Sequence, residues 1–270
     1  MDRPLLNITM NIMNNKIVIL TLIAAVIVSL WGSREVCAKS PMDFQVAPLA
    51  SKISIYKGLA EIKNRLEESP DNIDLINQWA FIADYYGFWE ETIKARTRLI
   101  EKGAGDFIVY VNLGREYMGL GEFDDAEKYL YQSLKIRPDN VFALYNLGLL
   151  YRYKGDFEQS LKFLKKASGI YPEWPEIYYE LANTYLMTKQ YDAAIENYTT
   201  SLELGLHDAA LFENLGISYL GKKEKLKALE SFEKALQTKS SDENLQKLFI
   251  AVKRSLPPDA LSGAQDTSPE

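Results

Sequence analysis

The chain has 270 residues, of which 47% are hydrophobic and 25% charged, and 37 Asp and Glu against 31 Lys and Arg give a formal net charge of −6. This is an ordinary globular composition, and the acidic balance argues against a protein that neutralises nucleic-acid phosphates. One histidine, His207, and one cysteine, Cys37, cannot build a His/Cys metal cluster, a disulfide framework or a Cys–His catalytic pair. We therefore expect a protein that is not an enzyme, needs no metal or cofactor, and does not bind nucleic acid.

Residues 1–38 carry the features of an export signal. Lys16 precedes an apolar run of about 15 residues, Ile17 to Trp31, and Val36-Cys37-Ala38 follows after a short polar stretch. A basic start, an apolar middle and a Val-x-Ala ending predict a signal peptide that is cleaved after Ala38. Translation from Met13 instead of Met1 would make this signal more compact.

The alternative for the same segment is a single uncleaved membrane anchor, because the apolar run falls only slightly below the roughly 17–25 residues of a membrane-spanning helix. In either case the basic side stays in the cytoplasm and the rest of the chain crosses. We therefore expect a periplasmic or secreted protein, or one anchored in the inner membrane with its bulk outside the cytoplasm. Contact with the membrane is expected only through this N-terminal segment.

The rest of the sequence repeats with a period of 34 residues. Tyrosines recur at this spacing, and so do small residues that would let two helices approach closely. Within one period the apolar positions recur at helical spacing, and a unit of this size buries its apolar face only by stacking on its neighbours. The three clearest columns are Tyr117, Tyr151, Tyr185 and Tyr219; Ala80, Gly114, Gly148, Ala182 and Gly216; and Thr92, Ala126, Ser160, Ala194 and Ala228.

This pattern resembles the tetratricopeptide repeat, whose consensus places an aromatic residue, Leu-Gly, Tyr, Ala, Phe, Ala and Pro at set offsets. The second and third copies fit best, as in YNLGLLYRYKGDFEQSLKFLKKASGIYP, which starts at Tyr145. The first copy departs most, with Ala83 in the tyrosine column and Arg96 where a large apolar residue is usual. The resemblance implies an all-α fold, a right-handed α-α superhelical solenoid of about five repeats at 73–106, 107–140, 141–174, 175–208 and 209–242.

The segments on either side of the repeats are expected to cap or extend the array. Residues 51–72 form an N-terminal capping helix or a degenerate repeat, and residues 243–256 form a C-terminal capping helix. Residues 39–50 are a linker, and the polar residues 257–270, which contain proline and serine, form a disordered tail.

In the family, such an array grips a peptide or protein partner in a concave groove lined by fixed positions of the first helix of each repeat. Carried over position by position, the set is aromatic and apolar with two arginines, which suits recognition of an extended peptide or a helix. The chaperone-binding clamp of the family is excluded, because its lysines are missing. The groove candidates are Arg115, Met118, Phe142, Tyr145, Leu149, Arg152, Tyr153, Tyr179, Asn183 and Met187.

The sequence therefore predicts an exported or membrane-anchored scaffold or adaptor that binds a peptide or protein in its groove. The alternative is a structural component of an envelope, secretion or pilus assembly complex, which self-associates into a homo-oligomer or docks through its convex face. Acidic pairs such as Glu90–Glu91 and Asp124–Asp125 lie at expected helix starts, where carboxylates suit the helix dipole.

Overall fold

A computed structural model of the chain describes residues 49–239 and 241–257, with side chains described from Tyr56 onward. The predicted signal peptide or anchor, most of the predicted linker and residues 258–270 of the predicted tail lie outside these residues. The described residues form twelve α-helices and no strand, which confirms the all-α class. None of the described helices has the length and apolarity needed to cross a membrane.

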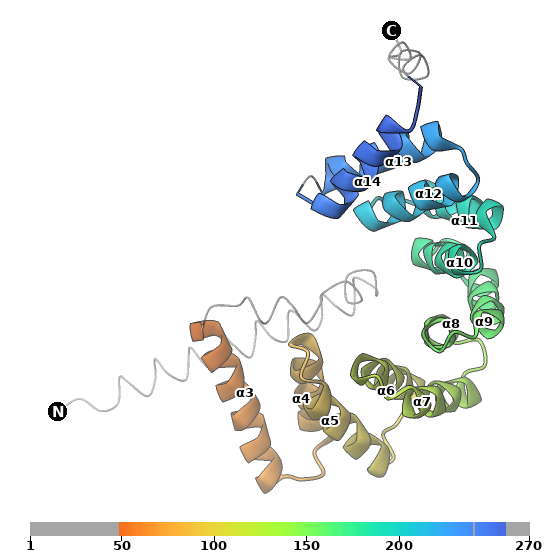
Figure 1. Cartoon of the computed structure of the whole chain (residues 1–270). Helices are drawn as coiled ribbons and strands as arrows, with labels where there is room; N and C mark the ends of the chain where they lie inside the picture. The colour runs from red at the N-terminus through yellow and green to blue at the C-terminus, as the bar shows by residue number, and fades with distance from the viewer. Residues whose placement is uncertain (1–48, 240, 258–270) are drawn as a thin grey trace. The chain divides into compact units, whose positions relative to one another are not determined.

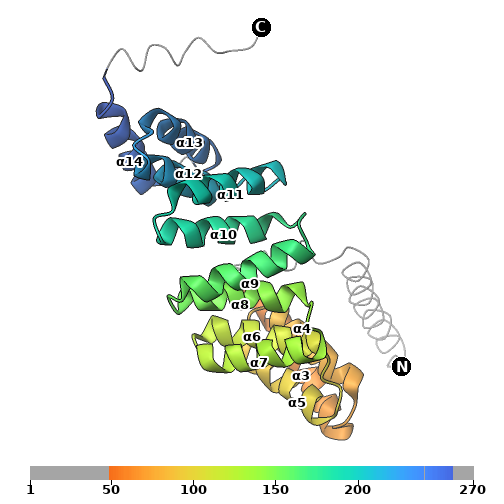
Figure 2. The ribbon, with the colours of Figure 1, turned by 90° about the vertical axis from the view of Figure 1, so that its right-hand side faces the viewer.

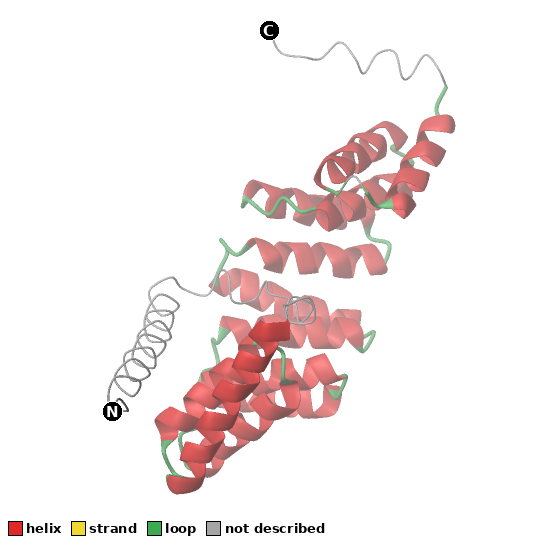
Figure 3. Cartoon of the chain, turned by 90° about the vertical axis from the view of Figure 1, so that its left-hand side faces the viewer, coloured by secondary structure: helices red, strands yellow, loops and turns green. Residues whose placement is uncertain are grey.

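The helices follow one another with short connections, as Figure 1 and the colouring of Figure 3 show. Their bounds are α3 (Leu49–Glu68), α4 (Ile73–Tyr85), α5 (Trp89–Glu101), α6 (Phe107–Leu120), α7 (Phe123–Ile136), α8 (Val141–Tyr153), α9 (Phe157–Ile170), α10 (Pro175–Met187), α11 (Tyr191–Glu203), α12 (Ala209–Gly221), α13 (Lys225–Thr238) and α14 (Glu243–Arg254).

The 34-residue period of the sequence is visible in where the helices begin. The first helices α4, α6, α8, α10 and α12 begin at residues 73, 107, 141, 175 and 209. Most of these starts are fixed by a side-chain cap: Asp106 accepts a hydrogen bond from the backbone N–H of Val109 at 2.9 Å, and Asn140 caps α8 in the same way. Helix α10 begins instead with Pro175, whose fixed φ suits the first helical position.

The described residues fall into two compact units, the first ending at Glu91 and the second beginning at Thr92. In the first unit, α3 packs against α4 through a stripe of buried residues that includes Leu59, Ile62 and Leu66. Glu91 accepts a hydrogen bond from the indole N–H of Trp79 at 3.2 Å. The cationic Nζ of Lys63 lies 5.4 Å from the centre of the same Trp79 ring, so this unit joins its helices by both apolar and polar contacts.

In the second unit each first helix packs closely against the second helix of its own pair: α6 on α7, α8 on α9, α10 on α11 and α12 on α13. The small-residue column explains how close this packing is. A Cβ atom built on Gly148 would lie 2.5 Å from the Cγ of Leu164, and one on Gly114 would lie equally near the Cγ of Leu130. Both leucines are fully buried, so the absence of a side chain at these glycines lets the helices meet.

Successive pairs of the second unit stack on one another as layers, which Figure 2 shows from the side. The first helices of neighbouring pairs also contact one another, α6 with α8, α8 with α10 and α10 with α12. The core runs between the layers and is built largely of leucines, among them Leu144, Leu147 and Leu164. Outside this core, several side chains of α6, α8 and α10 are exposed or half-buried.

Candidate partner-binding surface

The ten candidate groove residues lie on three neighbouring first helices: Arg115 and Met118 on α6, five residues on α8, and three on α10. None of the ten belongs to the fully buried core, and all are at least partly exposed. Tyr153 and Met187 are the most open, with 59% and 61% of their surface exposed. The side of the three helices that carries these ten residues is called here the first-helix surface.

An indole holds two of the aromatic rings of the first-helix surface in place. The ring centres of Tyr145 and Phe142 lie 4.7 Å and 5.3 Å from that of Trp174, the residue that precedes α10. Aromatic contacts at these distances fix ring orientation as well as bury area. Trp174, which was not among the predicted groove residues, thus links the surface of α8 to the start of the next pair.

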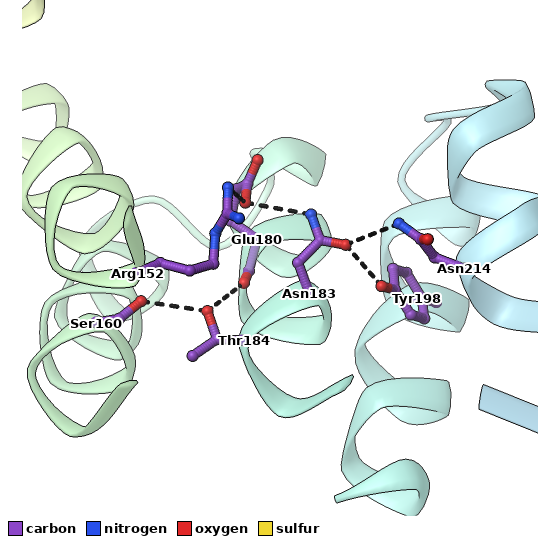
Figure 4. A network of polar contacts seen from close by, with 7 residues as sticks. All are labelled: Arg152, Ser160, Glu180, Asn183, Thr184, Tyr198 and Asn214. Atoms are coloured by element: carbon purple, nitrogen blue, oxygen red, sulfur yellow. Dashed lines mark hydrogen bonds and ion pairs between the residues drawn. The ribbon is translucent and has the colours of Figure 1, made fainter. Parts of the chain in front are cut away.

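A largely buried ion pair joins α8 to α10 (Figure 4). An Nη atom of Arg152 lies 2.9 Å from Oε2 of Glu180, and the two side chains are only 18% and 11% exposed. Burial raises the pKa of Glu180 above its ordinary value, while the charge of Arg152 and the hydrogen bonds from Asn183 and Arg152 offset part of this rise. The guanidinium also lies over the Tyr153 ring, 4.9 Å from its centre.

Asn183 extends this ion pair into a network that reaches α12, as Figure 4 shows. Its Nδ2 donates to Glu180 at 3.2 Å, and its Oδ1 accepts from the Tyr198 hydroxyl at 2.6 Å and from Asn214 Nδ2 at 3.1 Å. Tyr198 is fully buried, and this burial raises the pKa of its hydroxyl above the ordinary value. Both lone pairs of the Asn183 carbonyl are thus used within the protein.

A second polar link ties the same helix to the one before it. The Thr184 hydroxyl donates to the backbone carbonyl of Glu180 at 2.8 Å, and its oxygen lies 3.2 Å from the hydroxyl of Ser160 on α9. Each of these hydroxyls is fully buried and has a partner, which is what a stable interior requires. The arrangement fixes α10, and with it the first-helix surface, on both sides.

Three residues of this network, Glu180, Tyr198 and Asn214, were not predicted as part of the site. A signal for Glu180 was present, because the corresponding positions of the second, third and fifth repeats hold Asn112, Asn146 and Asn214. Arg152 stands one repeat earlier in a column that otherwise holds Asp or an apolar residue. Arg152 in the third repeat and Glu180 in the fourth each depart from their column, and together they form one ion pair.

Arg96, which also departs from an apolar column of the repeat, marks a second ion pair between neighbouring helix pairs. The structure buries Arg96 on α5 against Glu116 on α6, where the two side chains form an ion pair. Among the described residues, no group of three or more His, Cys, Asp and Glu side chains is arranged to hold a metal ion.

Comparison with known proteins agrees with this architecture. Residues 105–173 match one family profile described as "Tetratricopeptide repeat", and residues 151–211 match a second profile of the same description. No curated protein matches the sequence.

Solved structures show the same fold at low sequence identity. A crystal structure of PilW, described as a widely conserved type IV pilus biogenesis factor, matches with a TM-score of 0.63 and 17% identity over 80% of this chain and 99% of that one. YrrB, described as a TPR protein with an unusual peptide-binding site, matches with a TM-score of 0.55 and 19% identity over 72% of this chain and 97% of YrrB.

The APC/C hetero-tetramer Cut9–Hcn1 matches with a TM-score of 0.63 and 21% identity over 74% of this chain. The match spans only 40% of that longer chain. The two profiles match this chain over residues 105–211, the helix pairs agree with that match, and the solved structures share the fold.

Proposed function

We propose that this chain is a non-enzymatic scaffold or adaptor that binds a peptide or protein partner on the first-helix surface. The observation that carries the proposal is the row of exposed or half-buried aromatic and methionine side chains on three successive first helices. Tyr145, Tyr153, Tyr179 and Met187 belong to it. Rigid aromatic area and adaptable methionine are what protein-recognition surfaces are enriched in.

The rigidity of this surface supports the same proposal. Trp174 holds two of its rings, and the Arg152–Glu180–Asn183 network holds α8, α10 and α12 together beneath it. A surface that is already ordered loses little conformational entropy on binding, which favours affinity. YrrB, which has this fold, is described as having a peptide-binding site, and that description is consistent with the proposal.

The binding proposal is tested by affinity capture with the full chain and two variants. Tyr153→Ala/Met187→Ala removes the two most exposed residues of the surface, and Ile136→Ala/Ile170→Ala removes two exposed isoleucines of α7 and α9 as a matched control. We expect partners captured by the native chain to be lost with the first variant and kept with the second. If both variants still captured the partners, the binding site would lie elsewhere on the chain. Circular dichroism checks that each variant is folded.

A second candidate function is structural, with the chain docking through the opposite face. Ile136 and Ile170 occupy the same column of two successive repeats and are 53% and 41% exposed on the second helices. PilW, which shares the fold, is described as a type IV pilus biogenesis factor. Loss of captured partners, or of self-association, with Ile136→Ala/Ile170→Ala alone would favour this function over the first.

We also propose that the chain is exported, with cleavage after Ala38 or with residues 17–31 as an anchor. The support is the basic, apolar and Val-x-Ala order of the first 38 residues. Mass spectrometry of the N-terminal peptide from fractionated cells decides between the two. A peptide that begins at Lys39 indicates cleavage, an intact N-terminus in the membrane fraction indicates an anchor, and an intact N-terminus in the cytoplasmic fraction contradicts export.

A further inference from the structure

We propose that a second copy of this chain docks on the exposed face of helices α9 and α11, in a two-fold symmetric dimer in which α9 of each copy lies against α11 of the other. This inference goes beyond the binding proposed for the first-helix surface. It rests on the structural candidate function and specifies the partner and the site of that function. Two observations carry it: the opposite charge of the two helices, and the register that brings these charges together.

The exposed charges of α9 and α11 have opposite sign. Helix α9 has three exposed lysines against one acidic residue, whereas α11 has three exposed acidic residues and no lysine or arginine. Successive second helices of one unit therefore present a basic face and then an acidic face. The charged residues are Glu158, Lys162, Lys165 and Lys166 on α9, and Asp192, Glu196 and Glu203 on α11.

Most of this charge is not neutralised within one copy. Lys162 and Lys166 donate only to neutral oxygens, each 3.4 Å away, and Lys165 Nζ lies 5.7 Å from the centre of a tyrosine ring. None of these three lysines forms an ion pair with another described residue. Glu196 and Glu203 likewise form none within the described part of the chain. Exposed charges that lack a partner in their own chain can be matched by a partner with the opposite charges.

The 34-residue register brings the two faces together in a dimer. The second helices α7, α9, α11 and α13 begin at residues 123, 157, 191 and 225, so residues 34 apart lie at the same height on successive helices. A two-fold axis that runs parallel to these helices, midway between α9 and α11, reverses the order of such a column in the other copy. One column of exposed residues changes sign at this axis, so each of its lysines meets a glutamate of the other copy. It consists of Lys128, Lys162, Glu196 and Glu230.

The neighbouring columns of α9 and α11 agree with this arrangement. Lys165 of one copy lies within one helical turn of both Glu196 and Glu203 of the other. Apolar area is added by Ile170, which is 41% exposed and comes opposite Leu204 at the end of α11. Each of these contacts occurs twice, because a two-fold interface is formed by the same surface of both copies.

The charges that do not match lie at the ends and the rim of the contact. Glu158 comes opposite Asp192, but Lys222 already forms an ion pair with Asp192. The turn before α9 adds one charge of each sign and the turn before α11 adds one lysine, so α9 remains basic and α11 acidic. Helices α7 and α13 carry both signs and meet at the rim, where Lys128 and Glu230 already have partners in their own copy. Specificity therefore depends on α9 and α11.

The size of the contact predicts a weak dimer. Helices α9 and α11 have 14 and 13 residues. They are therefore about 20 Å long and, at about 10 Å of width each, cover about 400 Å² per copy. Because a standard stable interface buries about 800 Å² per partner, we expect a dissociation constant in the micromolar range that rises with salt.

Sedimentation velocity of the full chain, over a wide range of concentration and at low and high salt, measures this dimer. Two variants each reverse the charge of one face: Lys162→Glu/Lys165→Glu on α9, and Glu196→Lys/Glu203→Lys on α11. We expect each variant alone to dimerise about tenfold or more weakly than the native chain, because like charges then meet across the contact.

A mixture of the two variants supplies a readout that loss of folding cannot imitate. The α9 variant is acidic on both helices and the α11 variant is basic on both, so an equimolar mixture should form a heterodimer about as tight as the native dimer. Lys247→Glu/Lys253→Glu is the matched control. It makes the same change of net charge as the α9 variant, on exposed lysines of α14, and should dimerise like the native chain.

The outcomes separate this inference from the binding function. A monomer at every concentration, a dimer that neither reversal weakens, or a mixture no tighter than its components would overturn the two-fold dimer. Partner capture on the first-helix surface would still stand, because Tyr153→Ala/Met187→Ala tests it separately. A dimer abolished by Tyr153→Ala/Met187→Ala would place the second copy on the first-helix surface and overturn the inference. If the chain were monomeric and Lys162→Glu/Lys165→Glu released a captured partner, the lysines would bind another acidic protein, which would also overturn it.

Discussion

The turn between the two helices of a pair places one residue in the left-handed region of backbone conformation. Gly121 and Gly155 occupy this position with φ of 78°, but lysines occupy it in the next two pairs, Lys189 at 59° and Lys223 at 64°. The backbone N–H of each lysine still closes the turn, at 2.9 Å from the carbonyls of Leu186 and Leu220. A side chain in this conformation costs roughly 1–2 kcal/mol, so these two turns are less stable than their glycine counterparts.

Replacing these lysines should therefore stabilise the fold. Lys189→Gly and Lys223→Gly are each expected to raise the free energy of unfolding in urea by about 0.5–1 kcal/mol, because the strain relieved exceeds the extra flexibility of the unfolded chain. Gly155→Ala is the matched control and should lower it by about 1 kcal/mol, since the added Cβ meets nothing within 4 Å and only the backbone is strained. Unchanged stability in the lysine variants would show that side-chain contacts compensate.

The pKa values of two glutamates in the second unit are shifted in opposite directions. Burial raises the pKa of Glu180 above 4.5. Burial also acts to raise the pKa of Glu127, but hydrogen bonds from Lys154 and Tyr151 outweigh it and lower the pKa below 4.5. The contribution of Glu180 to the free energy of unfolding is therefore present below pH 4.5 and is lost as the pH rises through its raised pKa. The contribution of Glu127 is present above pH 4.5 and is lost as the pH falls through its lowered pKa.

Carbon-detected NMR titration of the glutamate carboxyl groups measures both values in one sample. We expect the midpoint of Glu180 above that of the exposed glutamates and the midpoint of Glu127 below it. A Glu180 midpoint at or below the exposed value would mean that Arg152 overcomes the cost of burial.

At the scale of the helix pair, stability depends on how closely α8 approaches α9. Gly148→Ala places a Cβ atom 2.5 Å from the Cγ of the fully buried Leu164, so one of the helices must shift. We expect a loss of about 1–3 kcal/mol in the free energy of unfolding. Gly169→Ala, inside α9 with nothing within 4 Å of the added atom, should instead gain about 0.5–1 kcal/mol from helix propensity. A stabilising Gly148→Ala would contradict the packing described for this pair.

The contact between successive pairs depends on the Arg152–Glu180 ion pair. Arg152→Met or Glu180→Asn alone leaves one buried charge without its partner, and each should lower the free energy of unfolding by about 2–3 kcal/mol. The double variant places at these positions the residue types that the second repeat has there, as Met118 and Asn112. Its free energy of unfolding should lie within about 1 kcal/mol of that of the native chain. Additive losses in this double-mutant cycle would show that the two side chains do not act as a pair.

At the scale of the whole molecule, the sequence was most informative about contacts that recur within every repeat. The meeting of Gly148 with Leu164 recurs as Gly114 with Leu130, so a 34-residue period reveals it and with it the all-helical fold. Contacts that join one repeat to the next by a particular pair of side chains do not recur. Arg152 was predicted as a groove residue, and the columns mark Arg152 and Glu180 as departures from the repeat without showing that the two are partners. The contacts of Trp174 with Phe142 and Tyr145 are displayed by no column.

Because each pair contacts mainly its neighbours, stability is expected to vary along the array. Helices α8 to α10 share a core cluster with layers on both sides, whereas α14 buries only Leu245 and Val252. Hydrogen exchange followed by mass spectrometry should therefore find the slowest backbone amides in α8, α9 and α10 and progressively faster exchange toward α13 and α14. Gly148→Ala should speed exchange in the central helices more than in α13 and α14, because it acts where each layer has two neighbours. Equal opening free energies in every helix would instead mean that the described repeats unfold as one cooperative block.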